Sequence, residues 1–209
     1  MVRKTKEEAQ ATRDSILQAA TEVFHEQGVA KAGLETIAER AGVTRGAIYW
    51  HFKNKASIFE ALHDKLHQSL MEIILEDLER DHPHPLKQLE ELCISLLLDI
   101  HHEPEKRKVL EIFFLKCDYS GDMAPFLSLQ RDNKAKHKEL FSRYFRRAMD
   151  KGYLRADTDP NLLTMSLFCY ITGIVHEYLR NPCLFNMEEE APRLMRQLFT
   201  GLAQCRKAE

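Results

Sequence analysis

Glycine and proline are scarce in this sequence, with 8 Gly and 7 Pro in 209 residues. Folds made of many short strands need these residues at their turns, whereas the plentiful Leu, Glu, Lys, Ala and Arg favour helices. The scarcity argues against a loop-rich β architecture, and the sequence predicts an all-α fold. A chain of this length can bury roughly 70% of its unfolded surface, so its stability requires no metal or disulfide.

Closely spaced cysteines are missing as well. The five cysteines are far apart, odd in number and form no C-x-x-C pair. Such a pattern indicates neither a disulfide framework nor a zinc knuckle. We interpret all five as small buried hydrophobic residues. They are Cys93, Cys117, Cys169, Cys183 and Cys205.

Long hydrophobic runs are not found either. The opening residues MVRKTKEEAQATRD contain no apolar stretch typical of a signal peptide, and no later segment reaches about 18 uncharged apolar residues. We therefore expect a cytoplasmic protein that does not enter a membrane.

Neither sign of charge dominates, since the formal net charge is −2. Residues 1–55 carry nine Lys or Arg against seven Asp or Glu, whereas the remaining residues carry 21 against 25. This small basic excess permits an anionic partner at the N-terminal end. Phosphate binding depends further on how the basic side chains cluster in space.

Apolar residues recur at spacings of three and four along the N-terminal 80 residues, which predicts four helices. The first follows a capping box at Thr5-x-x-Glu8, the third covers residues 45–51, and the fourth runs to about residue 80. The expected caps and stops are Thr44 and Asn54 at N-termini and Gly28 and Gly42 at C-termini.

Five more helices are expected in the remainder, for a total of about nine. The segment DHPHP at residues 81–85 breaks the fourth helix, and Pro104 opens the sixth. The other three are expected at residues 125–151, 160–180 and 188–205.

The first three helices, the second and third joined by a Gly turn, have the form of a helix-turn-helix unit. Ile48 and Phe52 lie four residues apart and would seat the third helix on the core. Two aromatic side chains beside a cation suit a DNA groove, where N–H and O–H groups meet phosphates and Arg can bind guanine. The alternative is that the aromatic side chains pack against the fourth helix. The residues left facing outward are Thr44, Arg45, Gly46, Tyr49, Trp50 and His51.

These segments resemble a known family. The run LETIAERAGVTRGAIYWHFKNKASIFEAL, preceded by TRDSILQAATEVFHEQGVA, closely resembles the DNA-binding region of TetR-family transcriptional repressors. The opening VRKTKEEAQATR and the later LEIFFLKCDY also resemble the branch of the family that controls multidrug efflux pumps. The first match covers about residues 3–65 and is highly specific, whereas similarity beyond it is patchy.

The resemblance implies a helix-turn-helix DNA-binding domain at residues 1–53 and a ligand-binding and dimerisation domain at residues 54–209. It implies that Thr44, Arg45 and Gly46 enter the major groove of double-stranded DNA, with Arg45 on a base edge. Phosphate or adjacent-groove contacts are implied for Lys4, Lys6, Thr36, Tyr49, Trp50, His51 and Lys55.

The resemblance also implies a homodimer on a pseudo-palindromic operator, with recognition helices about 34–36 Å apart. The last two helices would form the dimer interface, with outward-facing candidates Leu163, Leu167, Ile174, Leu194, Leu198 and Leu202. The alternative is that these residues, or a good part of them, are ordinary core within one chain. A hydrophobic inducer would bind among the fourth to eighth helices, although each candidate is equally compatible with ordinary core. The candidate lining residues are Leu66, Leu92, Cys93, Leu96, Leu110, Phe113, Phe114, His137, Phe141, Phe168, Ile171, Thr172, Val175 and His176, with Glu111 as an anionic anchor.

Other kinds of function find little support. The sequence contains no G-x-S-x-G, P-loop or G-x-G-x-x-G motif, so we expect neither an enzyme nor a cofactor. The histidine pairs at residues 63 and 67, 82 and 84, and 101 and 102 lack a third ligand at a usual spacing, so no metal site is expected. We therefore predict a ligand-responsive repressor controlling a multidrug efflux operon. The alternative is a helical protein-binding adaptor, which would leave the exposed Arg45 and Tyr49 unexplained.

Overall fold

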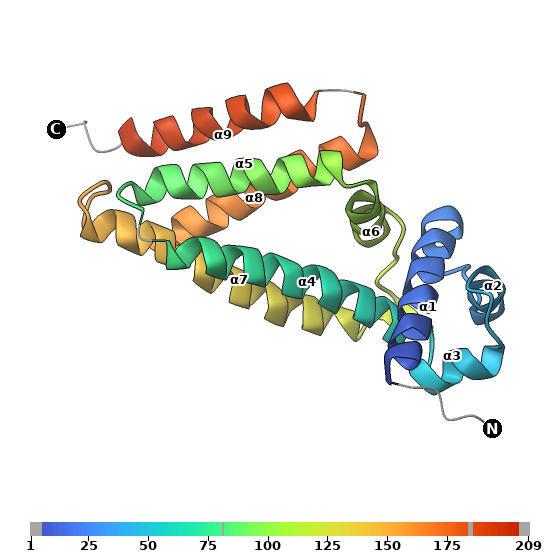
Figure 1. Ribbon diagram of the computed structural model, residues 1–209. Helices are drawn as coiled ribbons and strands as arrows, with labels where there is room; N and C mark the ends of the chain where they lie inside the picture. Colours follow the sequence, from blue (N-terminus) through green and yellow to red (C-terminus); the bar gives the residue numbers. More distant parts are fainter. Residues whose placement is uncertain (1–5, 81, 184–185, 205–209) are drawn as a thin grey trace. The chain divides into compact units, whose positions relative to one another are not determined.

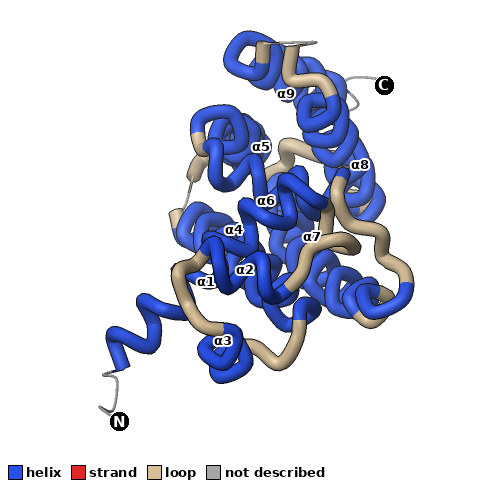
Figure 2. Tube along the Cα trace, turned by 90° about the vertical axis from the view of Figure 1, so that its right-hand side faces the viewer, coloured by secondary structure: helices blue, strands red, loops and turns tan. Residues whose placement is uncertain are grey.

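The computed structural model describes residues 6–80, 82–183 and 186–204, and all regular structure in these ranges is helical (Figure 1). Figure 2 shows the same helices joined by loops, with no strand in the described ranges. The all-α prediction is therefore confirmed. The helices are α1 (Lys6–Gln27), α2 (Leu34–Arg40), α3 (Arg45–His51), α4 (Lys55–Glu79), α5 (Pro85–His102), α6 (Pro104–Leu115), the 3₁₀ helix η1 (Gly121–Met123), α7 (Phe126–Asp150), α8 (Pro160–Arg180) and α9 (Met187–Gln204).

Local signals set the helix ends, as predicted. The Thr44 side-chain oxygen accepts a hydrogen bond of 3.1 Å from the Ala47 N–H, which caps α3. Asn54 Oδ1 accepts a 2.9 Å bond from the Ser57 N–H ahead of α4. Thr5, the expected first cap, lies outside the described residues. Left-handed glycines end helices at Gly28, Gly42 and Gly152, with φ of 78°, 66° and 72°.

The chain folds into two compact units. The first contains residues up to 67 and residues 105–128, which bring together α1, α2, α3, the first half of α4 and α6. The second contains residues 68–104 and those from 129 onward. The division falls within α4, while the predicted functional boundary between residues 53 and 54 stays a prediction.

The first unit has an aromatic core centred on Phe59 of α4, which is fully buried. The Phe59 ring centroid lies 4.9 Å from that of Phe113 in α6 and 4.7 Å from that of Phe126 in α7. Phe24 of α1 meets the same ring edge-on at 6.3 Å. Edge-to-face pairs at these separations are favourable, so α6 shares one core with the N-terminal helices.

The same core seats α3, as its spacing predicts. Ile48 of α3 is fully buried, and Phe52, at the C-terminal end of this helix, is also buried. Ile16 of α1 and Ile37 of α2 are fully buried as well. Because these positions point inward, the opposite face of α3 is left exposed.

In the second unit, α5 and α9 run side by side (Figure 1). Met187, Ala191 and Met195 of α9 are fully buried, and Phe199 continues this face. Their regular spacing of four residues places them on one side of the helix, which packs into the unit's core.

The structure decides two expectations about side-chain exposure. Leu167 and Ile174, candidates for the outward face of α8, are buried in the chain's own core, which was the alternative for these residues. All five cysteines were predicted to be buried, but Cys169 and Cys183 are exposed and Cys117 is half-buried. Cys93 is buried as predicted, and Cys205 lies outside the described residues. Helical period indicates that α8 has apolar positions on several sides, but only packing decides which of these sides faces the core.

Candidate DNA-binding surface

The exposed side of α3 carries large aromatic side chains. Trp50 is 72% exposed and Tyr49 is 49% exposed, although apolar groups of this size are normally buried. His51 is half-buried and lies edge-on to Trp50, with ring centroids 4.5 Å apart. Thr44, Arg45 and Gly46 are exposed beside them. We call the exposed residues Thr44, Arg45, Gly46, Tyr49 and Trp50 the recognition surface.

Arg45 is held in place by two neighbours. Its Nη1 atom donates to Glu35 Oε1 of α2 at 2.7 Å, and its Nη2 atom donates to the Tyr49 hydroxyl at 3.3 Å. The guanidinium also lies over the Tyr49 ring, 5.6 Å from the centroid. Tyr49 and then Glu35 raise the pKa of Arg45 above its ordinary value. Sequence reasoning missed Glu35, because nothing local to α2 indicates a partner on α3.

Gly46 is not required by the fold. Its φ is outside the left-handed region, and a Cβ there would meet only Thr44 Oγ1, at an ordinary 3.7 Å. A glycine in a helix costs about 1 kcal/mol relative to alanine. Its presence in the middle of the recognition surface is therefore explained better by close approach of another molecule than by folding.

The other residues predicted to contact DNA differ in their exposure and in the contacts they already make. The Lys55 ammonium donates to the Ala30 carbonyl at 2.9 Å, so it already fastens the start of α4 to the loop after α1. Thr36 is half-buried and Lys6 is exposed. Lys4 lies outside the described residues.

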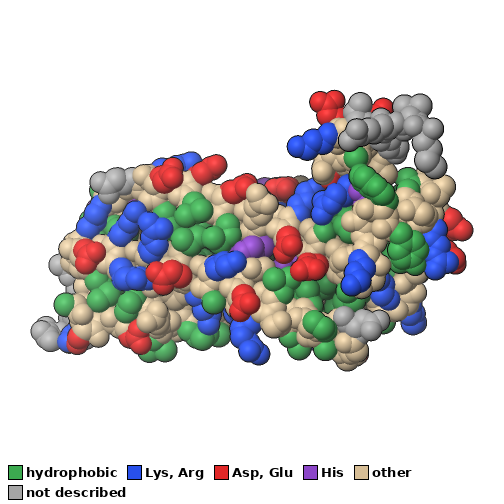
Figure 3. Space-filling model, turned by 90° about the horizontal axis from the view of Figure 1, so that it is seen from below, with side chains coloured by type: hydrophobic (Ala, Val, Ile, Leu, Met, Phe, Trp, Pro, Cys, Tyr) green, Lys and Arg blue, Asp and Glu red, His purple; other side chains and the backbone are tan. Residues whose placement is uncertain are grey.

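Side chains of both charges are mixed on one face of the molecule (Figure 3). On the face in Figure 3, basic and acidic side chains are interspersed, with hydrophobic side chains exposed between them. This mixture of charges on one face agrees with the small net charge of the chain.

Helix α6 is tied directly to α1. The carboxylate of Glu111 is paired with the His25 ring, and Arg107 Nε lies 3.9 Å from the same carboxylate. The Val29 N–H, just beyond α1, donates to the Lys116 carbonyl at 3.1 Å. Glu111, expected to anchor a ligand, is thus already occupied by protein groups in this conformation.

The ligand-binding candidates of the first unit differ in exposure. Phe113 is buried in the aromatic core, where it contacts Phe59 and His63 edge-on. Phe114 is 39% exposed, whereas Leu66 and Leu110 are half-buried. Phe113 thus has a clear packing role in this conformation.

The candidates of the second unit are mostly interior. Burial raises the pKa of the Cys93 thiol, as desolvation disfavours the thiolate. Phe141 and Phe168 meet edge-on with centroids 5.2 Å apart. Leu92, Cys93, Phe141 and Val175 are buried, Leu96, His137, Phe168, Ile171 and His176 are half-buried, and Thr172 is exposed. Their role in ligand binding stays a prediction.

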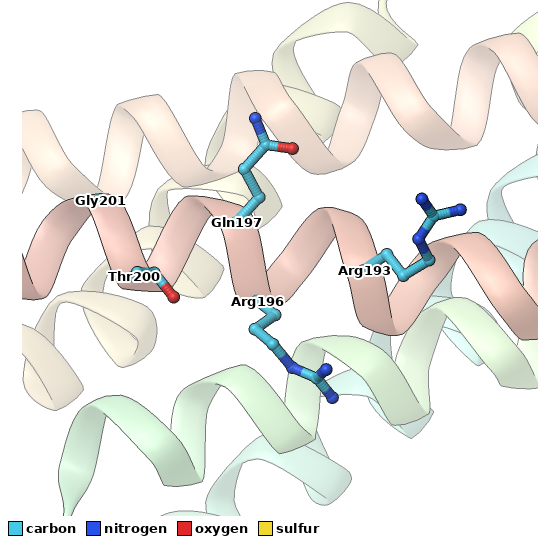
Figure 4. A pocket seen from close by; sticks show the side chains of 5 residues that line it. All are labelled: Arg193, Arg196, Gln197, Thr200 and Gly201. Atoms are coloured by element: carbon cyan, nitrogen blue, oxygen red, sulfur yellow. The ribbon is translucent and has the colours of Figure 1, made fainter.

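A recess of about 450 Å³ lies elsewhere, along the exposed side of α9 (Figure 4). Its lining comes from one helix and includes none of the predicted ligand-binding residues. The lining residues are Arg193, Arg196, Gln197, Thr200 and Gly201.

Two protein families match successive parts of the chain. Residues 16–62 match the model of bacterial regulatory proteins of the tetR family. Residues 84–203 match the C-terminal region of MAATS-type transcriptional repressors. The first match contains the recognition surface, and the second contains α5 to α9.

Similar proteins of known function cover nearly the whole chain. The regulator AcrR of Shigella flexneri is 35% identical over 91% of this chain and 89% of its own length. NalD of Pseudomonas aeruginosa, described as the secondary repressor of the MexAB-OprM multidrug efflux pump, has a solved structure with a TM-score of 0.83 at 32% identity, covering 94% of this chain and 98% of that one.

A third relative was solved with a small molecule. SmeT, the repressor of the Stenotrophomonas maltophilia efflux pump SmeDEF, matches in its triclosan complex with a TM-score of 0.82 at 31% identity. The match covers 92% of this chain and 91% of that one. These relatives are regulators rather than enzymes, and they do not favour the adaptor alternative. The chain therefore belongs to the TetR family of bacterial regulatory proteins, and its relatives include repressors of multidrug efflux pumps.

Proposed function

We propose that the recognition surface docks in the major groove of a pseudo-palindromic operator, in two copies, and that hydrophobic compounds release it. The observation that carries this proposal is the exposure of Trp50 and Tyr49 around a positioned Arg45. Exposed aromatic groups cost free energy in an isolated protein, and this cost is offset where a partner covers them.

The residues of the recognition surface are proposed to contact either bases or phosphates. Arg45 reads a base edge, because a guanidinium can donate two parallel hydrogen bonds to guanine. Tyr49, Trp50 and Thr44 contact the backbone, because hydroxyl and indole N–H groups donate to phosphate oxygens. Gly46 allows the α3 backbone to approach the duplex. Phosphate contacts set the salt dependence of binding, whereas the base contact sets sequence preference.

A second copy of the chain is proposed to cover the exposed side of α8. Leu162 is 63% exposed and Met165 44% exposed, one turn apart, and Cys169 continues the same side. By length and composition α8 is apolar enough to cross a membrane, with 33% of its most apolar stretch buried within the chain. Burying this surface against a second α8 accounts for its composition, since apolar residues are concentrated in homodimer interfaces.

The inducer is proposed to act through α6. A hydrophobic compound placed against Leu110 or Phe113 must displace part of α6, which is bound to α1 through Glu111 and His25. Displacement of α6 would therefore shift the helices that carry the recognition surface. By thermodynamic linkage, the inducer weakens DNA binding by the same factor by which DNA weakens inducer binding. Because its proposed target is DNA, we propose that the protein acts in the cytoplasm.

Trp50 provides a direct experiment, because it is the only tryptophan in the chain. Its fluorescence should change when the protein binds DNA from beside its own coding region. The affinity should fall steeply with salt, and a panel of lipophilic cations and phenolic compounds should include one that reverses the change. Equal affinity for this DNA and for random duplexes at every salt concentration would refute the proposal.

A further inference from the structure

The last turn of α5 and the first turn of α9 bring three metal-binding side chains together. One ligand atom each of His101, His102 and Glu188 lies within 4.8 Å of the others. His102 Nε2 and Glu188 Oε1 are already 2.8 Å apart. The third member could not be found from sequence spacing, because Glu188 follows His102 by 86 residues.

These groups match the ligand preferences of a borderline divalent metal. Two imidazoles and one carboxylate are the protein ligands of open zinc sites, in which water completes the coordination. Donor atoms around a tetrahedral zinc ion lie about 3.3 Å apart, given bonds of about 2.0–2.2 Å. His102 and Glu188 are exposed, so small side-chain rotations suffice to close the remaining distance.

His101 is oriented by a buried neighbour. Its Nδ1 atom lies 2.8 Å from the hydroxyl of Tyr178, a side chain that is only 2% exposed. When Nδ1–H donates to this hydroxyl, the lone pair of Nε2 is available to a metal. Histidine ligands are commonly held in this manner by a partner on the second nitrogen.

Buried neighbours anchor the two helix ends that carry these side chains. Ile100, next to the histidines on α5, and Met187, next to Glu188 on α9, are both buried. The C-terminal end of a helix favours a cation and the N-terminal end favours a carboxylate, which is the arrangement found here.

We propose that His101, His102 and Glu188 form a binding site for a zinc-like divalent transition-metal ion that joins the end of α5 to the start of α9. This proposal revises the prediction from sequence that the chain holds no metal, and it is independent of the proposed DNA contacts. The competing interpretation is that His102 and Glu188 form only a surface hydrogen bond.

Titration of the full-length protein with Co²⁺ tests the proposal, because its visible spectrum reports ligand type. We expect one ion per chain, with the spectrum of nitrogen and oxygen ligands, and displacement by Zn²⁺. His102→Gln and Glu188→Gln should each weaken binding by at least about tenfold, since each removes a ligand. Tyr178→Phe should weaken it by about tenfold or more while preserving the stoichiometry.

The double variant His82→Gln/His84→Gln is the matched control, because it removes two histidines that lie close to each other. Among the described residues, this pair belongs to no comparable cluster with a carboxylate. Its Co²⁺ affinity should equal that of the wild type. A thiolate charge-transfer band, binding that survives the loss of Glu188 and His102, or the absence of saturable binding would overturn the proposal. Circular dichroism confirms that each variant is folded, and Trp50 fluorescence separates this site from the DNA contacts.

Discussion

The guanidinium of Arg45 is bonded to the carboxylate of Glu35, with Nη1 and Oε1 2.7 Å apart across two helices. Both side chains are more than half exposed, so the pair adds little to folding stability. The ion pair instead fixes the direction of the guanidinium, because Glu35 holds Arg45 in one orientation on the recognition surface.

Arg45→Ala should therefore weaken operator binding by about 1–3 kcal/mol, the usual value of a bidentate base contact, while random DNA loses less. Fluorescence anisotropy with operator and scrambled duplexes measures both affinities. Equal losses on the two duplexes would reassign Arg45 to the phosphates.

Glu35→Gln should have a different effect. Removing a carboxylate near the duplex should raise affinity for random DNA, because it removes repulsion from phosphates. Specificity should fall, because Arg45 loses its orienting partner. The same anisotropy assay gives the ratio of the two affinities, and an unchanged ratio would contradict a positioning role for Glu35.

Gly46→Ala should separate folding from DNA binding. The added Cβ has space and alanine favours a helix, so thermal stability should be unchanged or slightly higher. Operator affinity should nevertheless fall, because the Cβ occupies the closest approach of α3 to the duplex. Gly42→Ala is the contrasting variant: at φ of 66° it should lose about 1–2 kcal/mol of stability. If Gly46→Ala retained full operator affinity, close approach at this position would be disproved.

Leu162→Asp should convert the dimer to a monomer without unfolding it. The side chain is 63% exposed in the single chain, so the charge is costly only when a second copy covers it. Leu127→Asp is a matched control on α7, where Leu127 is 46% exposed and outside the proposed interface. Analytical ultracentrifugation should find a monomer for the first variant and a dimer for the second. A dimeric Leu162→Asp protein would place the interface elsewhere.

His63 should make the protein sensitive to mild acid. Burial against Phe113 and Phe126 lowers the pKa of His63 below its ordinary value of 6.5. The unfolded chain then binds the proton more tightly than the folded chain, so this contribution to stability is complete above pH 6.5 and is lost as the pH falls below it.

Urea unfolding at several pH values measures this contribution. His63→Gln should flatten the acid side of the stability profile, whereas His84→Gln, at an exposed position, should keep the wild-type profile. Parallel wild-type and His63→Gln profiles would rule out this histidine as the cause.

Much of the recognition surface was predictable, since its determinants are close together in the sequence. Thr44 caps α3 by accepting a hydrogen bond from the N–H of Ala47, only three residues further along the chain. Ile48 and Phe52 share the buried face of the helix, so Tyr49 and Trp50 are left exposed. The inducer residues were less predictable. An apolar position such as Phe113 has the same helical period whether it lines a cavity or fills a core.

The sequence by itself determined the nine helices of the described residues, the caps at Thr44 and Asn54 and the outward face of α3, because these depend on interactions within about one helical turn. Only the tertiary structure decided that Glu35 holds Arg45, that Glu111 pairs with His25, and that Glu188 joins the histidines of α5. Packing chooses such partners across many residues, and no spacing along the chain encodes which two helix faces will meet.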